Sequence, residues 1–210
     1  MKKRFILAIA CLASAAPVAA EKASQKDTRQ ILQEFARCAV RREARAADEY
    51  VSSQPGSPMP RELLSRLPEC LQAVRDEATL RGQAGDYRFA FAEALLIRKY
   101  RDSMPPDPTQ AQPLERKIVT FPPDSKGESE LGTLGECIVR AAPTESWALL
   151  RTDAASAAEA TAFKAIGPGM KTCVRNGLIV QMPAFFMRGT IAENYYRLSK
   201  APRIAAGAAR

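Results

Sequence analysis

Histidine is absent from the 210 residues of this chain. Without an imidazole, Ser-His-Asp and Cys-His catalysis are excluded, and the commonest protein ligand for zinc is missing. The sequence also contains no Ser-x-x-Lys and no Cys-x-x-Cys. An acyl transferase of the serine–lysine type and a thioredoxin-like redox pair are therefore not supported. These absences predict a chain without a metal site or another cofactor.

Neither sign of charge forms a dense patch along the sequence. Lys and Arg number 31 against 23 Asp and Glu, and aromatic residues make up only 7% of the chain. A nucleic-acid surface usually combines a dense basic face with interleaved aromatics. We therefore expect no nucleic-acid partner and a mildly basic, solvated surface whose charge serves solubility.

Only the N-terminus carries a continuous apolar stretch. Basic residues (2–4) precede apolar residues (5–15), and small residues stand before Glu21. This pattern is typical of a secretory signal peptide with cleavage after Ala20, which leaves a periplasmic or secreted chain. The alternative is a lipoprotein signal with Cys11 as the lipid-bearing residue, although the residues before Cys11 match poorly. A membrane helix needs about 20 apolar residues, and no segment after the signal is long enough.

Four cysteines follow the signal, in two copies of one pattern. Cys38 and Cys137 each open a Cys-x-Val-Arg sequence, and Cys70 and Cys173 follow 32 and 36 residues later. Cysteines of an exported chain meet an oxidising compartment, where pairing is the default. Three connectivities are possible. We favour Cys38–Cys70 with Cys137–Cys173, because an ancestral single copy would have needed its own bond, which would add about 3–4 kcal/mol of stability.

A second pair of matching segments closes the two copies. Arg88 and Glu93 recur as Arg188 and Glu193, at an offset of 100 residues. Together with the cysteines, they predict an internal repeat. The segment between the copies holds six of the 15 prolines and reads as an extended connector. The predicted segments are a signal peptide (1–20), a first helical repeat (24–101), a Pro-rich linker (102–127), a second helical repeat (128–199) and a flexible tail (200–210).

Apolar spacing in both copies is helical, and no run alternates over a full strand length. We therefore expect an all-α fold of two tandem, disulfide-stapled helical repeats. The first helix has no proline near Glu43 and is expected to run on to Val51, whereas Pro143 restarts a helix in the second copy. Gly167-Pro168-Gly169 is expected to end a helix before Cys173. The other expected helices are 60–74, 84–101, 154–166 and 182–199, and the apolar residues 118–121 of the linker would form an edge strand or an arm.

The two motifs support one resemblance. The Cys-x-Val-Arg opening, with the Arg-Gly-x-x-Ala-Glu-x-x-Tyr close at Arg188, resembles a group of uncharacterised exported proteins of alphaproteobacteria. The first copy departs from this pattern, because Phe89 stands where the second copy has Gly189. The resemblance covers most of both copies and implies export and helical repeats. It implies no catalytic residue.

The repeated Arg88, Glu93, Arg188 and Glu193 are the candidate functional residues. Arginine and glutamate five residues apart lie about 140° apart on a helix, so we expect each to pair elsewhere. The structural hypothesis is a pair of helix-packing ion pairs. The functional alternative is an exported hydrolase with Glu93 and Glu193 facing one cleft, as in glycoside hydrolysis.

Phe185, Phe186 and Met187 are candidates for a ligand groove, because methionine and aromatic side chains adapt to varied partners. Their helical spacing equally suits core packing. The sequence as a whole favours an exported helical binding or structural module over an enzyme. Its partner would be an envelope protein, a peptide or a lipid.

Overall fold

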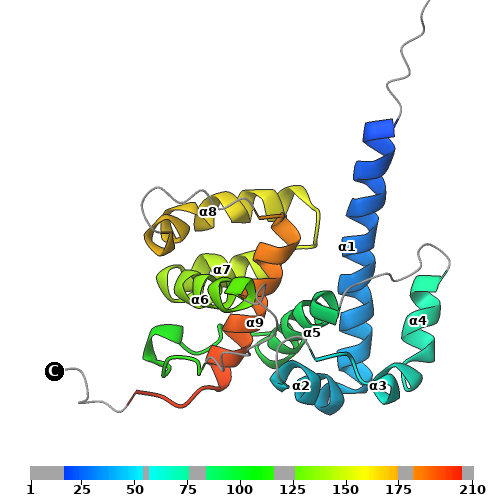
Figure 1. Cartoon of the computed structure of the whole chain (residues 1–210), viewed down its shortest axis with the longest axis horizontal. Helices are drawn as coiled ribbons and strands as arrows, with labels where there is room; N and C mark the ends of the chain where they lie inside the picture. Colours follow the sequence, from blue (N-terminus) through cyan, green and yellow to red (C-terminus); the bar gives the residue numbers. More distant parts are fainter. Residues whose placement is uncertain (1–16, 54–56, 76–83, 116–125, 175–181, 205–210) are drawn as a thin grey trace, which may run out of the picture.

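Helices form both halves of the chain, and the described residues contain no strand. The computed structural model describes residues 17–53, 57–75, 84–115, 126–174 and 182–204 (Figure 1). The predicted all-α class is therefore confirmed. The N-terminal half consists of α1 (Pro17–Arg42), α2 (Ala44–Ser52), α3 (Arg61–Ser65), α4 (Pro68–Arg75) and α5 (Ala84–Lys99). The C-terminal half follows the short 3-10 helix η1 (Pro108–Gln110) and consists of α6 (Lys126–Ala141), α7 (Pro143–Leu150), α8 (Ala157–Cys173) and α9 (Ala184–Lys200).

α5 and α9 occupy the centre of the molecule and pack against each other more extensively than any other two helices described. Figure 1 shows them between α1 on one side and the stacked α6, α7 and α8 on the other. Phe91 of α5 is fully buried, with its ring centroid 5.9 Å from that of Phe35 and 6.0 Å from that of Tyr50. In the C-terminal half, the ring centroids of Trp147 and Tyr195 lie 6.4 Å apart.

Both predicted disulfides are present, each within one half of the chain. Cys38–Cys70 joins α1 to α4, and Cys137–Cys173 joins α6 to the end of α8; the Cα atoms are 5.7 Å apart in both. Two disulfides indicate an oxidising, extracytoplasmic compartment, because cytosolic thiols are kept reduced. The disulfide pairing is thus confirmed, whereas the internal repeat stays a prediction.

The expectation that the first helix runs on to Val51 is wrong. Glu43 leaves helical geometry (φ −127°, ψ 49°) and separates α1 from α2, as Ala142 (φ −142°, ψ 62°) separates α6 from α7. Pro143 explains only the second break. The break at Glu43 comes from packing, since it lets α2 turn so that Tyr50 and Val51 are buried against α5.

Two other expected boundaries also differ. The helix expected over 60–74 is split into α3 and α4, with Pro68 at the first position of the second piece, where a missing amide costs nothing. Gly167-Pro168-Gly169 does not end a helix: α8 continues to Cys173 with Pro168 inside it. Tertiary contacts hold this part of α8, because Ile166 is buried, and a Cβ at Gly169 would lie 2.7 Å from that of Ala142.

The described part of the predicted linker packs on the C-terminal half. Arg140 of α6 donates hydrogen bonds to the carbonyl oxygens of Pro108 (2.6 Å) and Ala111 (3.1 Å). The tail meets the same segment: Gln112 N donates to Pro202 O at 2.8 Å, and Ile204 N donates to Gln110 O at 2.9 Å. The first residues of the tail are therefore fixed by an isolated bridge rather than frayed.

Some sequence predictions fall outside the described residues. These include residues 1–16 of the expected signal peptide, while Pro17–Ala20 form the first turn of α1. The apolar linker run at 118–121 also lies outside them. Among the helices that the structure describes, none has the length and apolar character needed to cross a membrane.

Candidate functional site

The N-terminal half contributes Arg88 to an ion pair with the opposite half. Arg88 Nε donates to Glu193 Oε1 of α9 at 2.9 Å, and the Arg88 side chain is 3% exposed. Its other nitrogens donate to carbonyl oxygens at the end of α2, Tyr50 (3.1 Å) and Val51 (2.6 Å) among them. Arg88 therefore caps the C-terminus of α2, where carbonyls lack helical donors and the helix dipole is negative.

Arg188 of α9 makes the reciprocal arrangement. Its Nε donates to Glu93 Oε2 of α5 at 2.7 Å, and its Nη2 donates to Glu93 Oε1 at 2.8 Å, a two-pronged contact that uses both carboxylate oxygens. Arg188 also donates to the carbonyls of Leu150 (3.2 Å) and Thr152 (2.8 Å) at the end of α7. Each arginine thus caps a helix of its own half and pairs with a glutamate of the other half.

A buried polar cluster surrounds the pair of Arg188 and Glu93. Glu159 Oε1 of α8 accepts from Arg188 Nη1 at 3.1 Å and from Arg29 Nη2 of α1 at 2.6 Å. Gln33 Nε2 donates to Glu93 Oε1 at 2.6 Å, and Gln33 Oε1 accepts from Ala154 N at 3.0 Å. The cluster joins α1, α5, α8 and α9 at one end of the α5–α9 contact.

The environment keeps Arg188 charged. Burial acts to lower the pKa of Arg188, but the carboxylates of Glu93 and Glu159 outweigh it, so the pKa lies above its ordinary value. The carboxylates of Glu93 and Glu159 face two guanidinium groups, that of Arg188, which is 4% exposed, and that of Arg29. The four charges form a neutralised network rather than a reactive pair of acids.

Sequence reasoning missed Arg29, Gln33 and Glu159. Glu159 had a usable signal, since Ser156-x-x-Glu159 is the capping-box pattern. Ser156 Oγ accepts from Glu159 N at 3.1 Å, while Glu159 Oε2 accepts from Ala155 N at 2.9 Å. Ala155 has a φ of 58°, and this amide contact helps to hold the left-handed residue. Gln33 offered no such signal, because its partners lie 60 residues or more away along the chain.

The cavity at this cluster is too small for a substrate. It has a volume of about 20 Å³ and is lined by side chains that include Arg29, Gln33, Phe89, Glu93 and Arg188. That is room for about one water molecule, whereas ligand pockets usually measure about 300–1,000 Å³. An open groove of about 490 Å³ elsewhere is lined by residues of α6 alone and includes neither candidate glutamate. Neither of these two pockets therefore brings Glu93 and Glu193 together.

The candidate groove residues Phe185, Phe186 and Met187 are not brought to one surface. Met187 is buried and belongs to the core. Phe185 is half-buried beside the small cavity, and Phe186 is exposed. Both rings contact Phe89 of α5, with centroids 6.5 and 6.4 Å away. The result is a small aromatic cluster at the start of α9.

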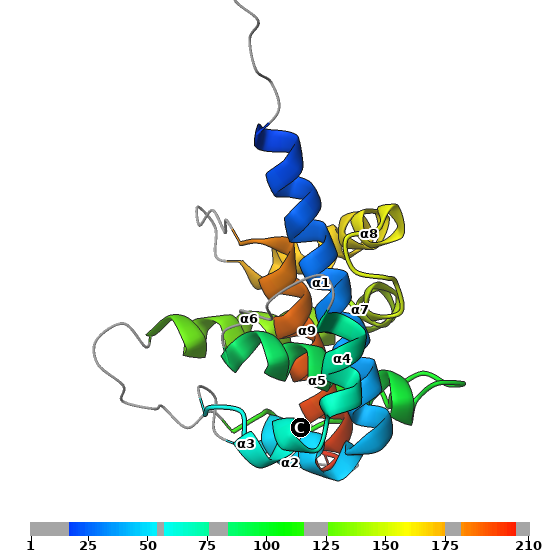
Figure 2. The same cartoon turned by 90° about the vertical axis from the view of Figure 1, so that its right-hand side faces the viewer.

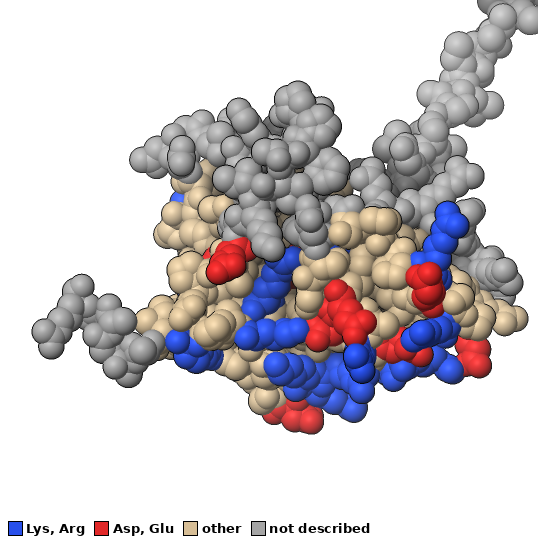
Figure 3. Space-filling view, turned by 60° about the horizontal axis from the view of Figure 1, so that its bottom comes forward, with Lys and Arg blue, Asp and Glu red and all other residues tan. Residues whose placement is uncertain are grey.

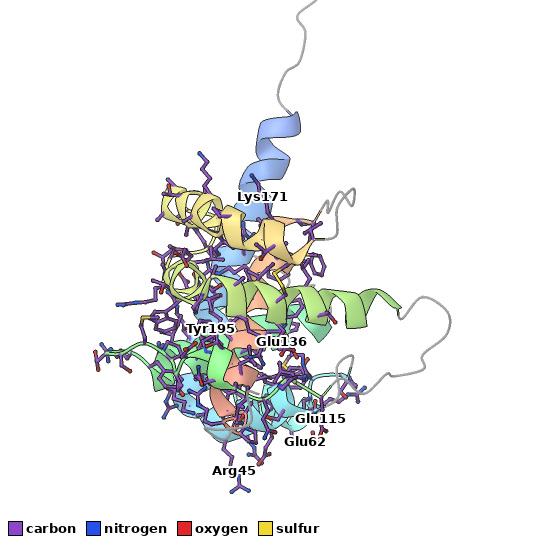
Figure 4. The ribbon with its side chains drawn as sticks, turned by 90° about the vertical axis from the view of Figure 1, so that its left-hand side faces the viewer. Arg45, Glu62, Glu115, Glu136, Lys171 and Tyr195 are labelled. Atoms are coloured by element: carbon purple, nitrogen blue, oxygen red, sulfur yellow. A yellow bond between two sulfur atoms is a disulfide. The ribbon has the colours of Figure 1, made fainter. Side chains whose placement is uncertain are left out.

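Charged side chains of both signs lie where α1, α5 and α9 end. Figure 3 shows Lys and Arg interspersed with Asp and Glu on this face. Arg42 pairs with Glu69, Lys200 with Asp48, and Arg45 with Glu49. Figure 4 shows Arg45 directed away from the body at this end, whereas Tyr195 lies among the helices. The mixed signs favour solvation over binding of a polyanion.

Two tyrosines of α9 titrate abnormally for structural reasons. Burial raises the pKa of Tyr195 to about 12, and its hydroxyl has no hydrogen-bond partner among the described residues. Burial and a hydrogen bond to Asp48 Oδ1 (2.7 Å) also raise the pKa of Tyr196. Neither hydroxyl is positioned as a base or nucleophile, because both are held in the neutral form.

Within the described ranges, no three Cys, Asp or Glu side chains gather as a metal site would require. Comparison with protein families, curated proteins and solved structures gives no match for this chain. The resemblance to exported alphaproteobacterial proteins therefore stays an expectation of the sequence motifs.

Proposed function

We propose that this chain is an exported helical module, periplasmic or secreted, that binds or supports a partner of the cell envelope and is not an enzyme. One observation carries the proposal. Glu93 and Glu193 are the repeated carboxylates that the hydrolase alternative would use for acid–base catalysis. Each is bound by an arginine that also caps a helix. Groups committed to buried ion pairs in this way stabilise a fold and are not free to transfer protons.

The disulfides support the same proposal. Each half has a staple between its first helix and a later one, which suits a rigid scaffold in an oxidising compartment. The basic n-region and the small residues before Glu21 support export through a signal peptide. A protein, a peptide or a lipid of the envelope would be the partner.

The test combines recovery of the partner with two matched variants. The tagged protein is expressed with its native N-terminus, cross-linked in cells and purified, and bound molecules are identified by mass spectrometry. Phe186→Ser removes an exposed ring of the aromatic cluster, and Met104→Ser removes another exposed apolar side chain elsewhere (37% and 49% exposed). We expect one envelope component to be recovered with the parent and with Met104→Ser. Reduced recovery with Phe186→Ser would place the partner at the aromatic cluster.

The hydrolase alternative predicts a different result. Purified protein would then release products from isolated cell-wall glycan, and Glu93→Gln would abolish this activity while the helical content stays unchanged. Such activity would overturn the proposal that the glutamates are structural.

A further inference from the structure

The contact between α5 and α9 has the form of an interface between two subunits. Arg88 of the N-terminal half pairs with Glu193, and Arg188 of the C-terminal half pairs with Glu93. The four residues occupy matching positions, 100 residues apart in the sequence. In a twofold interface, residue i of one subunit contacts residue j of the other, and j contacts i in return. The crossed ion pairs reproduce this reciprocity within one chain.

The apolar part of the contact has the same form. Phe89 and Gly189, also 100 residues apart, contact each other, so matching positions meet as they do near a twofold axis. Figure 1 shows α5 and α9 between α1 and the stacked α6, α7 and α8, and both helices again lie near the middle of the view in Figure 2, so the axis would lie in the interior. A homodimer would have the same residue at both places, whereas this chain has one large and one small.

Among the residues that the structure describes, no covalent bond other than the backbone joins the two halves. Cys38–Cys70 lies within the N-terminal half and Cys137–Cys173 within the C-terminal half. The residues that lead out of α5, Asp102 to Met104, are exposed. A backbone tether raises the effective concentration of the two faces, because their pairing becomes an intramolecular event. The two halves of one chain therefore pair with each other in preference to the halves of a second chain.

We propose that the α5–α9 face is a self-recognition surface, and that the partner it fits is the opposite half of a second copy of this chain. Continuity of the backbone is then unnecessary for the association. The N-terminal half of one chain then forms the two crossed Arg–Glu pairs with the C-terminal half of another chain. Two chains can exchange halves in this way.

A chain that can be cut tests the proposal. A protease site is inserted between Ser103 and Met104, the protein is purified with its disulfides intact, and then it is cleaved. We expect the two halves to co-migrate at the mass of the uncut protein by size exclusion and native mass spectrometry, with helicity unchanged in far-UV circular dichroism. Separation of the halves at micromolar concentration, folded or unfolded, would overturn the proposal.

Exchange is then tested with two cleaved samples, one carrying a tag on the C-terminal half. The samples are mixed in urea without reductant and refolded together. We expect hybrids that contain the N-terminal half of one sample and the C-terminal half of the other. If the halves refold and re-associate without any hybrid, or fail to re-associate at all, the second copy is not a partner.

A matched pair of variants tests the interface residues. Glu193→Ala removes a carboxylate that crosses the interface, and Glu49→Ala removes one that pairs with Arg45 within α2. Loss of one member of a buried charge pair weakens association strongly. We therefore expect Glu193→Ala to raise the dissociation constant of the cleaved halves at least tenfold and Glu49→Ala to leave it unchanged. Equal effects of the two variants would refute the role of the crossed pairs.

Discussion

Phe89 packs directly on Gly189, and the two helices that carry them can approach only because one position is a glycine. A Cβ added to Gly189 would lie 2.6 Å from the Cβ of Phe89 and closer still to its ring. The two residues stand at matching places in the two copies of the sequence motif. The close approach of α5 and α9 requires that one of these places hold a glycine when the other holds a phenylalanine. Two side chains with a Cβ could not meet here without moving the helices apart.

We expect Gly189→Ala to destabilise the protein. The added methyl group would overlap Phe89 at a point where α5 and α9 already pack closely. Overpacking of this kind costs about 1–3 kcal/mol. In a Phe89→Gly background the same substitution should cost far less, since the overlapping atoms are gone. Urea unfolding of the parent, both single variants and the double variant measures this coupling.

Gly167→Ala is the matched control. Gly167 also lies inside a helix, but a Cβ there would meet no atom within 4 Å. Replacing a helix-interior glycine by alanine should therefore raise the free energy of unfolding by about 0.5–1 kcal/mol. Equal losses at both glycines would contradict the close contact of Phe89 with Gly189.

Glu93→Gln should lower stability more than Glu193→Gln. Glu93 is 7% exposed, uses both oxygens on Arg188 and also accepts from Gln33, whereas Glu193 is 13% exposed and accepts from Arg88 Nε through Oε1. Breaking a buried pair costs about 3–5 kcal/mol. A single hydrogen bond to a charged group contributes about 1.5–3 kcal/mol. Thermal melts of both variants beside the parent provide the comparison.

The outcome also separates the two functional hypotheses. Both variants are expected to melt below the parent. If either melts above it, the carboxylates store like-charge strain, as catalytic groups often do, and the hydrolase alternative gains support.

Local patterns predicted much of this fold, and long-range contacts explain what they missed. The buried stripe of Ile31, Leu32 and Phe35 and the helix start at Pro143 follow from spacing and backbone chemistry. The break at Glu43 and the continuation of α8 through Pro168 do not, because tertiary packing overrides the local preference at both places.

The candidate site was predictable only in part. The offset of 100 residues singled out the two arginines and two glutamates, but a sequence offset does not say which arginine meets which glutamate. The crossed pairing depends on how α5 lies against α9. Gln33 and Arg29 join the cluster for the same reason, since α1 reaches it only in the folded chain.

Reduction should cleave Cys137–Cys173 before Cys38–Cys70. Cys38 is half-buried and Cys70 is fully buried, whereas Cys137 and Cys173 are both half-buried, so the second disulfide offers two partly accessible sulfur atoms to an attacking thiolate and the first offers one. Limited treatment with a reductant, followed by alkylation and peptide mass spectrometry, should therefore label Cys137 and Cys173 first. Simultaneous labelling of all four cysteines would show that access does not control the order.

The exported protein should begin at Glu21. Small residues at positions 18–20 fit the requirement of signal peptidase, and α1 would then lose only its first turn, Pro17–Ala20. The intact mass of protein from the periplasmic fraction measures the start. A species that begins at a lipidated Cys11 would make the protein a lipoprotein and refute the soluble form.

Asp48→Asn should reduce stability at neutral pH but not in strong acid. Burial acts to raise the pKa of Asp48, but hydrogen bonds from Lys200 and Tyr196 outweigh it and hold the pKa below its ordinary value. The unfolded chain therefore binds this proton more readily, so the stabilisation is fully present above the unfolded pKa of about 3.9. It is lost as the pH falls through the lower folded value.

Urea unfolding at pH 6 and at pH 2.5 measures this difference between the parent and Asp48→Asn. We expect a gap at pH 6 that narrows at pH 2.5, because acid protonates Asp48 in the parent and cannot change an asparagine. Tyr196→Phe removes one of the donors to Asp48 and leaves Lys200 in place. The difference in free energy of unfolding between the parent and Tyr196→Phe should therefore have the same sign as for Asp48→Asn and be smaller. A gap for Asp48→Asn that widens in acid would mean that the folded protein holds the protonated carboxyl more tightly than the unfolded chain does. The interaction of Asp48 with Lys200 and Tyr196 would then be too weak to overcome burial.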